Sequence, residues 1–432
     1  NFTNNTDIDQ TIHSHGVRLD NTADGVPDVT QKVVKPGESY AYNVTFRDAG
    51  VAWYHPHTRD DIGQEMGLYG NYVVDPADPL YWNQVNRDIP LVIDDVLIDA
   101  DGTLGDFFDD TVTHALLGRF GNTYLVNGES NYVLPMKKGE VVRFYITNVS
   151  NTRSYKLSIP GAKMKLAGAD LGRYEKEFFA DSVMLSPAER AVIEVYFENE
   201  GTYRLTHTMP SGIVELASFA VSSDIPATSY ADEFSALRTN DDVVSEFSRF
   251  REFAYQKADK RLLLTIDAQS AMNIDHSGHA HGATDSSAGG HMMPDGSMMQ
   301  GMNMMGASGE AALQWDDPLN SDAINTIKNI VWRLVDQDTG KSNADIPLSS
   351  WTFKKGSLVK ISLTNNAMAM HTMQHPIHLH GQRFVELSRN GVVNQNMAWK
   401  DTVLVLPGET VDILVDMSNT GNWMLHCHIV EH

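Results

Sequence analysis

The chain has 432 residues, of which 42% are hydrophobic and 21% charged, the balance of a globular protein that can bury a sizeable core. Its formal net charge of −23 argues against a nucleic-acid partner, because binding phosphates requires clustered lysine and arginine. No apolar run approaches the roughly 20 residues of a membrane-spanning helix, and the single cysteine excludes an internal disulfide.

Short strands are predicted along the whole chain. Runs rich in β-branched and aromatic residues follow turn sequences such as Lys-Pro-Gly-Glu and Lys-Lys-Gly-Glu, and few segments have a helical period. This pattern is typical of β-sandwiches, so we expect an all-β protein. The clearest runs are 38–46, 141–148, 191–199, 358–365 and 410–417.

The sequence also repeats itself. Residues 36–58 and 407–429 both begin with Pro-Gly-Glu, and each carries two histidines at the same offsets from a glycine. A third copy, 187–209, has threonines at those two positions. Three copies predict three homologous sandwich domains, of which the middle one has lost the histidines and acts as a spacer.

The repeats suggest domain limits, and a biased segment interrupts the third domain. Glycine, serine, methionine and histidine dominate the segment, a composition that cannot build a core, so we expect a disordered insertion. Because the first repeat starts inside a strand, we expect its initial strands to precede Asn1. The expected limits are 1–76, 77–224, a linker 225–258 with room for a short helix, and 259–432 with the insertion at 272–309.

Ten of the 17 histidines fall in four short motifs. Residues i and i+2 of a strand face the same side, so each His-x-His pair aims two imidazoles at one place. Four such pairs from the first and third domains exceed the needs of one metal ion and predict a cluster of ions. The motifs are His13 and His15; His55 and His57; His375, His378 and His380; and His426, His428 and His432.

The only cysteine, Cys427, lies between His426 and His428, so its side chain points to the opposite face of the strand. It therefore serves a different site. A thiolate with two imidazoles is the trigonal environment of blue copper, and His375 and His432 lie outside the paired positions. Electrons could then pass through a few covalent bonds from Cys427 to its neighbours. A buried structural cysteine, the alternative, would not explain the flanking histidines.

The motifs H-x-H-G, H-x-H, H-x-x-H-x-H and H-C-H-x-x-x-H occur intact and in order. Over essentially the whole chain, the sequence resembles the three-domain, laccase-like multicopper oxidases. The resemblance implies three cupredoxin-like Greek-key sandwiches and four copper ions. It assigns His375, Cys427 and His432 to type 1 copper, His13 and His378 to type 2, and His15, His55, His57, His380, His426 and His428 to the type 3 pair.

Two further expectations rest on this resemblance. Many bacterial members carry a carboxylate after the first H-x-H-G that assists proton delivery to oxygen, and Asp24 falls at the matching position. Asp24-Gly25 can also be read as a simple turn. The axial ligand of type 1 copper should come about five residues after His432, so its identity is open. Cys427 and Asp24 are thus the predicted catalytic residues.

The electron donor is suggested by a methionine-rich stretch within the insertion. Thioethers are soft ligands that select Cu(I), and the stretch resembles the insertions of bacterial copper-efflux and copper-resistance oxidases, which oxidise Cu(I). The alternative is a linker whose methionines scavenge oxidants. The candidate Cu(I) ligands are Met292, Met293, Met298, Met299, Met302, Met304 and Met305.

The expected function is a cuprous oxidase that reduces O₂ to water, with O₂ and Cu(I) or small phenols as partners. A phenol-oxidising laccase is the nearest rival. A non-catalytic copper-binding protein is less favoured because every motif ligand is present, a two-domain nitrite reductase because the chain has three repeats, and a ferroxidase because no carboxylate cluster points to iron. We expect a monomer without a membrane span, in the periplasm or secreted.

Overall fold

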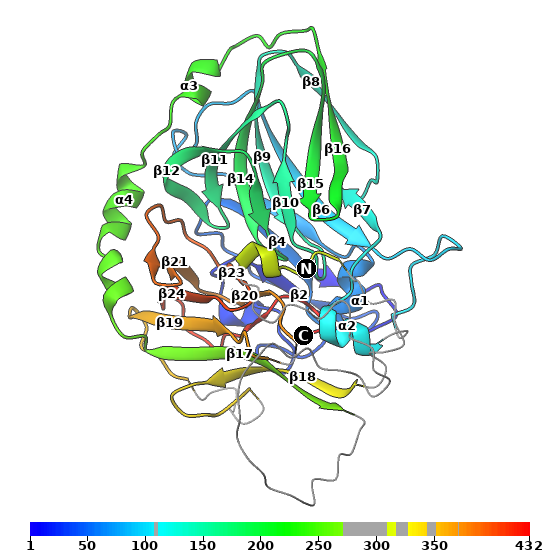
Figure 1. Ribbon diagram of the computed structural model, residues 1–432, viewed down its shortest axis with the longest axis vertical. Helices are drawn as coiled ribbons and strands as arrows, with labels where there is room; N and C mark the ends of the chain where they lie inside the picture. Colours follow the sequence, from blue (N-terminus) through cyan, green and yellow to red (C-terminus); the bar gives the residue numbers. More distant parts are fainter. Residues whose placement is uncertain (108–110, 271–308, 317–326, 344–350, 370) are drawn as a thin grey trace, which may run out of the picture.

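The computed structural model describes residues 1–432 except 108–110, 271–308, 317–326, 344–350 and 370. The regular secondary structure of its described part is mostly β-strand, with a few short helices, which confirms the predicted all-β class. The strands between about residues 130 and 222 gather at one end of the molecule, and those from residue 260 onward lie toward the other end (Figure 1). The predicted insertion 272–309, which includes the seven candidate Cu(I)-binding methionines, lies outside the described residues apart from its final position.

The N-terminal part forms two small sheets. One pairs β1 (Phe2–Thr3) with β3 (Ser39–Tyr40), and the other has the order β2 (Ile12–His15), β4 (Gly50–Pro56), β5 (Gly70–Val74). The 3-10 helix η1 (Asn21–Ala23) and helix α1 (Asp60–Glu65) lie in the connections. The strand predicted over 38–46 was wrong beyond Tyr40, because residues 41–46 do not join a β-ladder in the described chain.

The middle part is a sandwich of two sheets with buried apolar side chains between them, among them Phe144, Phe197 and Phe219. One sheet has the order β13-β10-β15-β16-β8 and the other β12-β11-β14-β9-β6-β7. Their bounds are β6 (Arg87–Val96), β7 (Thr123–Val126), β8 (Tyr132–Lys137), β9 (Glu140–Asn148), β10 (Tyr155–Ser158), β11 (Lys163–Ala169), β12 (Gly172–Ala180), β13 (Val183–Leu185), β14 (Arg190–Phe197), β15 (Gly201–Met209) and β16 (Gly212–Ser222).

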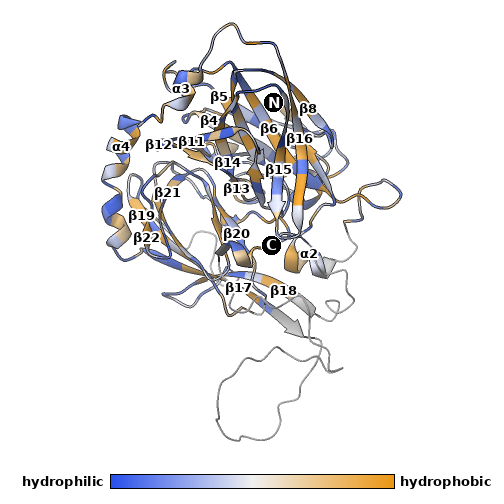
Figure 2. Cartoon of the chain, turned by 45° about the horizontal axis from the view of Figure 1, so that its top comes forward, coloured by the Kyte–Doolittle hydropathy of each residue, from blue (hydrophilic) through white to orange (hydrophobic). Residues whose placement is uncertain are grey.

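The connection to the third part contains short helices, as the sequence allowed. These are α3 (Ala231–Ser235), α4 (Asp241–Ser248) and η2 (Arg251–Tyr255). Helix α4 runs along the outside of the molecule with many hydrophilic residues (Figure 2). Its Phe247 turns inward and, with Phe250, packs against Trp399 of the third part and Leu171 of the middle part.

The third part is again a sandwich, with sheets of order β18-β17-β19-β24-β21-β22 and β23-β20-β25. The predicted runs 141–148, 191–199, 358–365 and 410–417 correspond to β9, β14, β19 and β24, which confirms these strands. The bounds are β17 (Lys260–Ser270), β18 (Ile327–Asp336), β19 (Leu358–Asn365), β20 (His375–Leu379), β21 (Arg383–Arg389), β22 (Val392–Val393), β23 (Thr402–Val405), β24 (Thr410–Asp416) and β25 (Leu425–Cys427), with helix α2 (Thr111–Leu117) and the 3-10 helix η3 (Gly309–Ala312) in connections.

Candidate metal centre

Strand register brings the histidine motifs together. In the N-terminal sheet β2 pairs with β4 so that His13 lies opposite His55. In the third part β20 pairs with β25 so that His378 lies opposite His426. The two small sheets thus present equivalent histidine pairs, as the internal repeat predicted.

The imidazoles of one of these sheets contact those of the other. The rings of His15 and His378 are stacked with centroids 3.6 Å apart, and those of His13 and His380 are 4.0 Å apart. The eight imidazoles expected to form the cluster all lie within this contact network: His13, His15, His55, His57, His378, His380, His426 and His428.

Backbone carbonyls set the proton position on several of these rings. The Nδ1 atom of His13 lies 2.7 Å from the Asp24 carbonyl oxygen, and that of His426 lies 2.8 Å from the Cys427 carbonyl oxygen. His55 and His378 have the same arrangement with the carbonyls of Pro56 and Asp401. A proton on Nδ1 leaves the lone pair of Nε2 free, which is how proteins orient a metal-ligating histidine.

The free nitrogens are buried and have no hydrogen-bond partner among the residues that the structure describes, a costly arrangement for a polar atom unless it binds something else. Copper suits this donor set, because imidazole is among its preferred ligands. His380 Nε2 and His426 Nε2 face each other at 3.0 Å. The partnerless atoms are Nε2 of His13, His55, His57 and His378, Nδ1 of His15, and both ring nitrogens of His428.

Burial also keeps the rings neutral. Loss of water around them lowers the pKa of His55, His380 and His428 well below the ordinary value of 6.5, and neighbouring imidazoles lower it further. The neutral imidazole is the form that ligates a metal. The cluster is therefore prepared to bind metal ions at physiological pH.

The thiol lies on the opposite face of β25, as predicted. The Sγ atom of Cys427 is 3.4 Å from His375 Nδ1 and 3.7 Å from His432 Nδ1, and the amide of Ile429 donates to the same sulfur at 3.5 Å. Removal from water raises the pKa of Cys427 to about 12 and lowers that of His375 to about 3. A metal that binds here must displace the thiol proton.

Asp24 lies inside the cluster, where its side chain is 1% exposed. Its Oδ2 is 3.2 Å from His380 Nδ1 and its main-chain oxygen holds His13. The residue follows η1 and precedes Gly25, which has φ +82°, so the segment also makes a turn. The position is compatible with both interpretations of the sequence.

Two residues near the histidines were missed by sequence reasoning. The Asp401 carboxylate is 2.9 Å from His15 Nε2, and its only sign was a charge inside the apolar run Trp-Lys-Asp-Thr-Val-Leu-Val-Leu. The Trp332 ring lies 4.3 Å from the His432 ring and 4.7 Å from the His375 ring. Nothing in the sequence around Trp332 distinguished it from a core aromatic.

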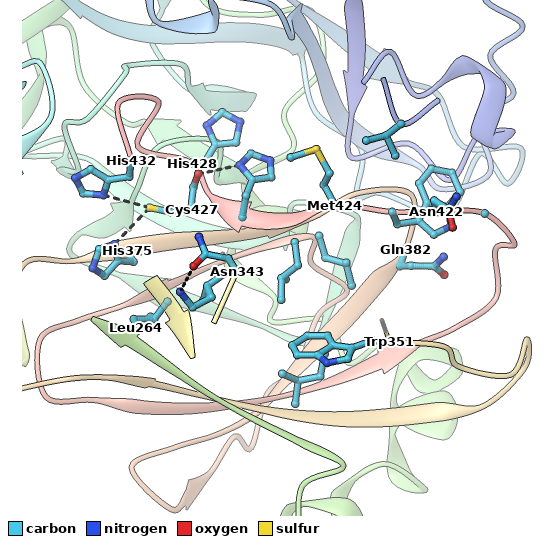
Figure 3. A pocket seen from close by; sticks show the side chains of 18 of the residues that line it. Leu264, Asn343, Trp351, His375, Gln382, Asn422, Met424, Cys427, His428 and His432 are labelled. Carbon is cyan, nitrogen blue, oxygen red and sulfur yellow. Dashed lines mark hydrogen bonds between the residues drawn. The ribbon is translucent and has the colours of Figure 1, made fainter. Parts of the chain in front are cut away.

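A cavity of about 740 Å³ adjoins the thiol. Cys427, His375 and His432 line one end of it with Leu264 close to His375, and Trp351 lines another part (Figure 3). The cavity lies against the strands of the third part. An apolar molecule could reach the side of the thiol site through it.

A thiol with two imidazoles, joined through its own backbone to a neutral imidazole cluster, is suited to transferring electrons between copper ions. The class of protein defined by this fold and site is a copper-dependent oxidoreductase. Family models described as multicopper oxidase match residues 1–79, 87–221 and 313–432. The chain belongs to the multicopper oxidase family, which uses O₂ as electron acceptor.

Individual relatives agree with this assignment. Copper resistance protein A of Escherichia coli is 24% identical, with 98% of this chain and 82% of the relative aligned. The copper resistance protein A homologue of Pseudomonas syringae is 25% identical, with 99% of this chain and 82% of the relative aligned. The fold is similar to that of a multicopper oxidase from Campylobacter jejuni, described as a metallo-oxidase, with a TM-score of 0.68, 22% identity, and coverage of 100% of this chain and 79% of that one.

Proposed function

We propose that this multicopper oxidase takes its electrons from Cu(I) and holds four copper ions. In this proposal His375, Cys427 and His432 hold type 1 copper, and His13 and His378 hold type 2. The type 3 pair is held by His15, His55, His57, His380, His426 and His428. The observation that carries the ligand set is the group of buried imidazole nitrogens without partners.

Bound copper would supply one-electron chemistry at the thiol and reduction of O₂ at the cluster. The chain's own residues connect the two sites. Cys427 offers its sulfur to one site, while its carbonyl oxygen orients His426 of the other at 2.8 Å. The path between the sites is therefore a few covalent bonds and one hydrogen bond long.

The choice of Cu(I) rests on the methionine-rich stretch, which lies outside the described residues. Seven methionines between Met292 and Met305 provide soft ligands that bind Cu(I) in preference to harder ions. Two relatives are named copper resistance proteins, which supports copper as the substrate. We propose that these methionines collect Cu(I) for the type 1 site, and that the enzyme acts in the periplasm or outside the cell.

Oxygen uptake tests this proposal. The copper-loaded protein is given Cu(I) or a simple phenol, and the same protein with Cys427→Ser corrects for uncatalysed oxidation of Cu(I) by air. Two variants are compared: deletion of 292–305, and replacement of its seven methionines by leucine, which keeps length and apolarity but removes sulfur. We expect both variants to slow Cu(I) turnover and to leave phenol turnover unchanged.

The control separates two explanations. If only the deletion slows Cu(I) turnover, the length of the segment matters and its thioethers do not. Unchanged Cu(I) turnover in both variants would overturn the Cu(I) proposal.

The cavity beside Cys427 favours a second candidate function. Its apolar walls, including Leu264 and Trp351, suit the ring of a phenolic donor. In a laccase of this kind, phenol turnover would exceed Cu(I) turnover. Replacement of the half-buried Trp351 by alanine would then lower phenol turnover and leave Cu(I) turnover unchanged.

A further inference from the structure

The middle part of the chain supplies none of the proposed copper ligands, yet it reaches the cluster through Arg190. This residue begins β14, and its side chain is 0% exposed. Its guanidinium donates Nη1 to Asp401 Oδ1 at 2.7 Å and Nη2 to Asp401 Oδ2. The same group donates Nε to the carbonyl oxygen of Val51 in β4 at 3.0 Å. Arg190 thus touches all three parts of the molecule.

Asp401 in turn holds two histidines of the cluster. Its Oδ1 accepts from His15 Nε2 at 2.9 Å, and its main-chain oxygen accepts from His378 Nδ1 at 2.9 Å. These bonds place the protons so that His15 Nδ1 and His378 Nε2 are left free, and both of those atoms are buried with no hydrogen-bond partner in the described part of the chain. The two rings come from different ends of the sequence and are stacked at 3.6 Å.

Asp170 fixes the other end of this arrangement. Its Oδ1 accepts the backbone amide of Arg190 at 2.9 Å, and its Oδ2 accepts the amide of Asp401 at 3.3 Å. The Lys400 ammonium lies 3.4 Å from the same Oδ2. The carboxylate that orients the histidines is therefore tied to the middle part through both its side chain and its backbone.

We propose that Arg190 is a positioning residue for the copper cluster, acting through Asp401 on His15 and His378. The inference rests on the proposed ligand set. A planar guanidinium that binds both carboxylate oxygens fixes the plane of the carboxylate, which a lysine cannot do. The guanidinium also keeps the Asp401 carboxylate hydrogen-bonded. A carboxylate oxygen of Asp401 lies within 4.8 Å of the ligand atoms of His15 and His378, so a free carboxylate could itself ligate a metal ion together with these histidines.

Arg153 provides a matched control, because a buried ion pair alone is weak evidence for a special role. It lies in the same middle part, its side chain is also 0% exposed, and its Nε is 2.7 Å from Asp95 Oδ2. Its side-chain hydrogen bonds go to Asp95, Gly121, Met209, Trp315 and Asp316, none of which is a cluster histidine. A change at Arg153 therefore reports the cost of disturbing a buried arginine without disturbing the cluster.

The experiment compares Arg190→Lys and Arg153→Lys in the full chain loaded with copper. Each protein is dialysed against increasing concentrations of a copper chelator, and retained copper is counted. The blue absorption of the type 1 site is an internal reference, and electron paramagnetic resonance reports type 2 copper. Loss of an outer partner of a metal ligand typically weakens metal binding about 10- to 100-fold. We expect that loss, with an altered type 2 spectrum, for Arg190→Lys alone.

Asp401→Asn is the second test, and it does not depend on whether the arginine variant folds. The asparagine amide has one oxygen in place of two, so it cannot accept both hydrogen bonds from the Arg190 guanidinium. We therefore expect the same loss of cluster copper. Retention of cluster copper with an unchanged type 2 spectrum in either variant overturns the proposal. If the unaltered protein takes up no copper at the cluster, the proposed function itself fails, which is a distinguishable outcome.

Discussion

At the scale of single residues, the site is determined by which ring nitrogen each histidine leaves unpaired. His13 and His55 donate Nδ1 to carbonyl oxygens within their own part of the chain and leave Nε2 free, whereas His15 donates Nε2 to Asp401 and leaves Nδ1 free. The His-x-His spacing predicted that each pair shares a face. It could not predict which nitrogen is free, because Asp24 and Asp401, the acceptors of His13 and His15, lie outside the strand that carries these histidines.

Replacement of Cys427 by serine tests the division of labour between the two sites. A serine hydroxyl does not replace a thiolate at a blue copper site, so we expect loss of the blue absorption and of oxygen uptake with any one-electron donor. The histidine cluster lies on the other face of β25 and should keep its copper and its type 2 resonance signal. Loss of that signal as well would show that the two sites do not bind copper independently.

Asp24→Asn tests the proposed proton role. The carboxylate lies 3.2 Å from His380 Nδ1, and an amide of the same shape cannot carry a proton to the cluster. Removal of a general acid or base typically costs about 10²- to 10⁴-fold in rate. We expect reoxidation of the reduced enzyme by O₂ to slow by at least about 10²-fold in rapid mixing, while reduction of type 1 copper is unchanged.

Asp20→Asn is the control for that variant. Asp20 caps the same 3-10 helix through Thr22, and it lies at the exposed start of the segment. Equal slowing in both variants would indicate that the loop, and not the carboxylate at the cluster, limits reoxidation.

At the scale of elements, the turn after each histidine strand of the H-x-H-G type requires glycine. Gly16 follows β2 with φ +79°, and Gly381 follows β20 with φ +59°. A Cβ on Gly16 would lie 2.4 Å from Arg190 Nη2 and 2.8 Å from Asp401 Oδ2, and a Cβ on Gly381 would lie 2.1 Å from the Trp423 ring. The turn at Gly16 therefore packs directly against the ion pair between Arg190 and Asp401.

Gly16→Ala should therefore disturb both the turn and the ion pair. Gly37→Ala in the same part of the chain is its control, since Gly37 has φ +82° but no atom within 4 Å of the added Cβ. In the control, the free energy of unfolding should fall only by the cost of placing a side chain in the left-handed backbone region, about 1–2 kcal/mol. In Gly16→Ala, the free energy of unfolding measured by chemical denaturation should fall further, and the cluster should also release copper. Equal losses, with copper retained, would show that Arg190 moves aside without consequence.

The elements themselves were largely predictable, and the exceptions have physical reasons. Runs 191–199 and 410–417 became β14 and β24 because both are apolar runs with partner strands on either side. The run 38–46 is also rich in aromatic and β-branched residues, yet only Ser39–Tyr40 is a strand, because a strand requires a hydrogen-bonded partner strand and composition does not provide one. Asp401 was missed for a similar reason, since its partners Arg190 and His15 are distant in sequence.

At the scale of the whole molecule, the cluster is an interface between the first and last parts of the chain. The motifs predicted this sharing because neither part alone has all eight imidazoles. The motifs did not predict that the middle part contacts the cluster. In the sequence, Arg190 is one charged residue at the start of a predicted strand and has no histidine motif around it. The domain limits 1–76, 77–224 and 259–432 stay a prediction, compatible with the three matched family models.

The copper-free protein should lose stability in acid. Burial lowers the pKa of His375 to about 3 and those of His371 and His207 to about 4, from 6.5. Between pH 6.5 and these values the unfolded chain binds more protons, so the free energy of unfolding falls as pH falls, by up to about 1.4 kcal/mol per pH unit for each histidine. Denaturation across this range measures the slope.

One histidine outside the copper sites calibrates that slope. His207 Nδ1 accepts the amide of Lys156 at 3.0 Å, and an asparagine oxygen can accept the same bond without titrating. His207→Asn should reduce the pH slope of the copper-free protein by up to about 1.4 kcal/mol per pH unit. An unchanged slope would mean that His207 does not titrate on unfolding as its burial implies.

Copper should also determine whether the ends of the chain unfold together. Metal bound by His13 and His378, or by His57 and His426, joins the first part to the third, and binding only to the folded form adds stability in proportion to the logarithm of the copper concentration. Removal of all copper should lower the melting temperature and separate the first part from a later transition in calorimetry. Cys427→Ser loses only copper held within the third part, so it should keep a single transition. Separate transitions in that variant would show that the thiol site also contributes to holding the parts together.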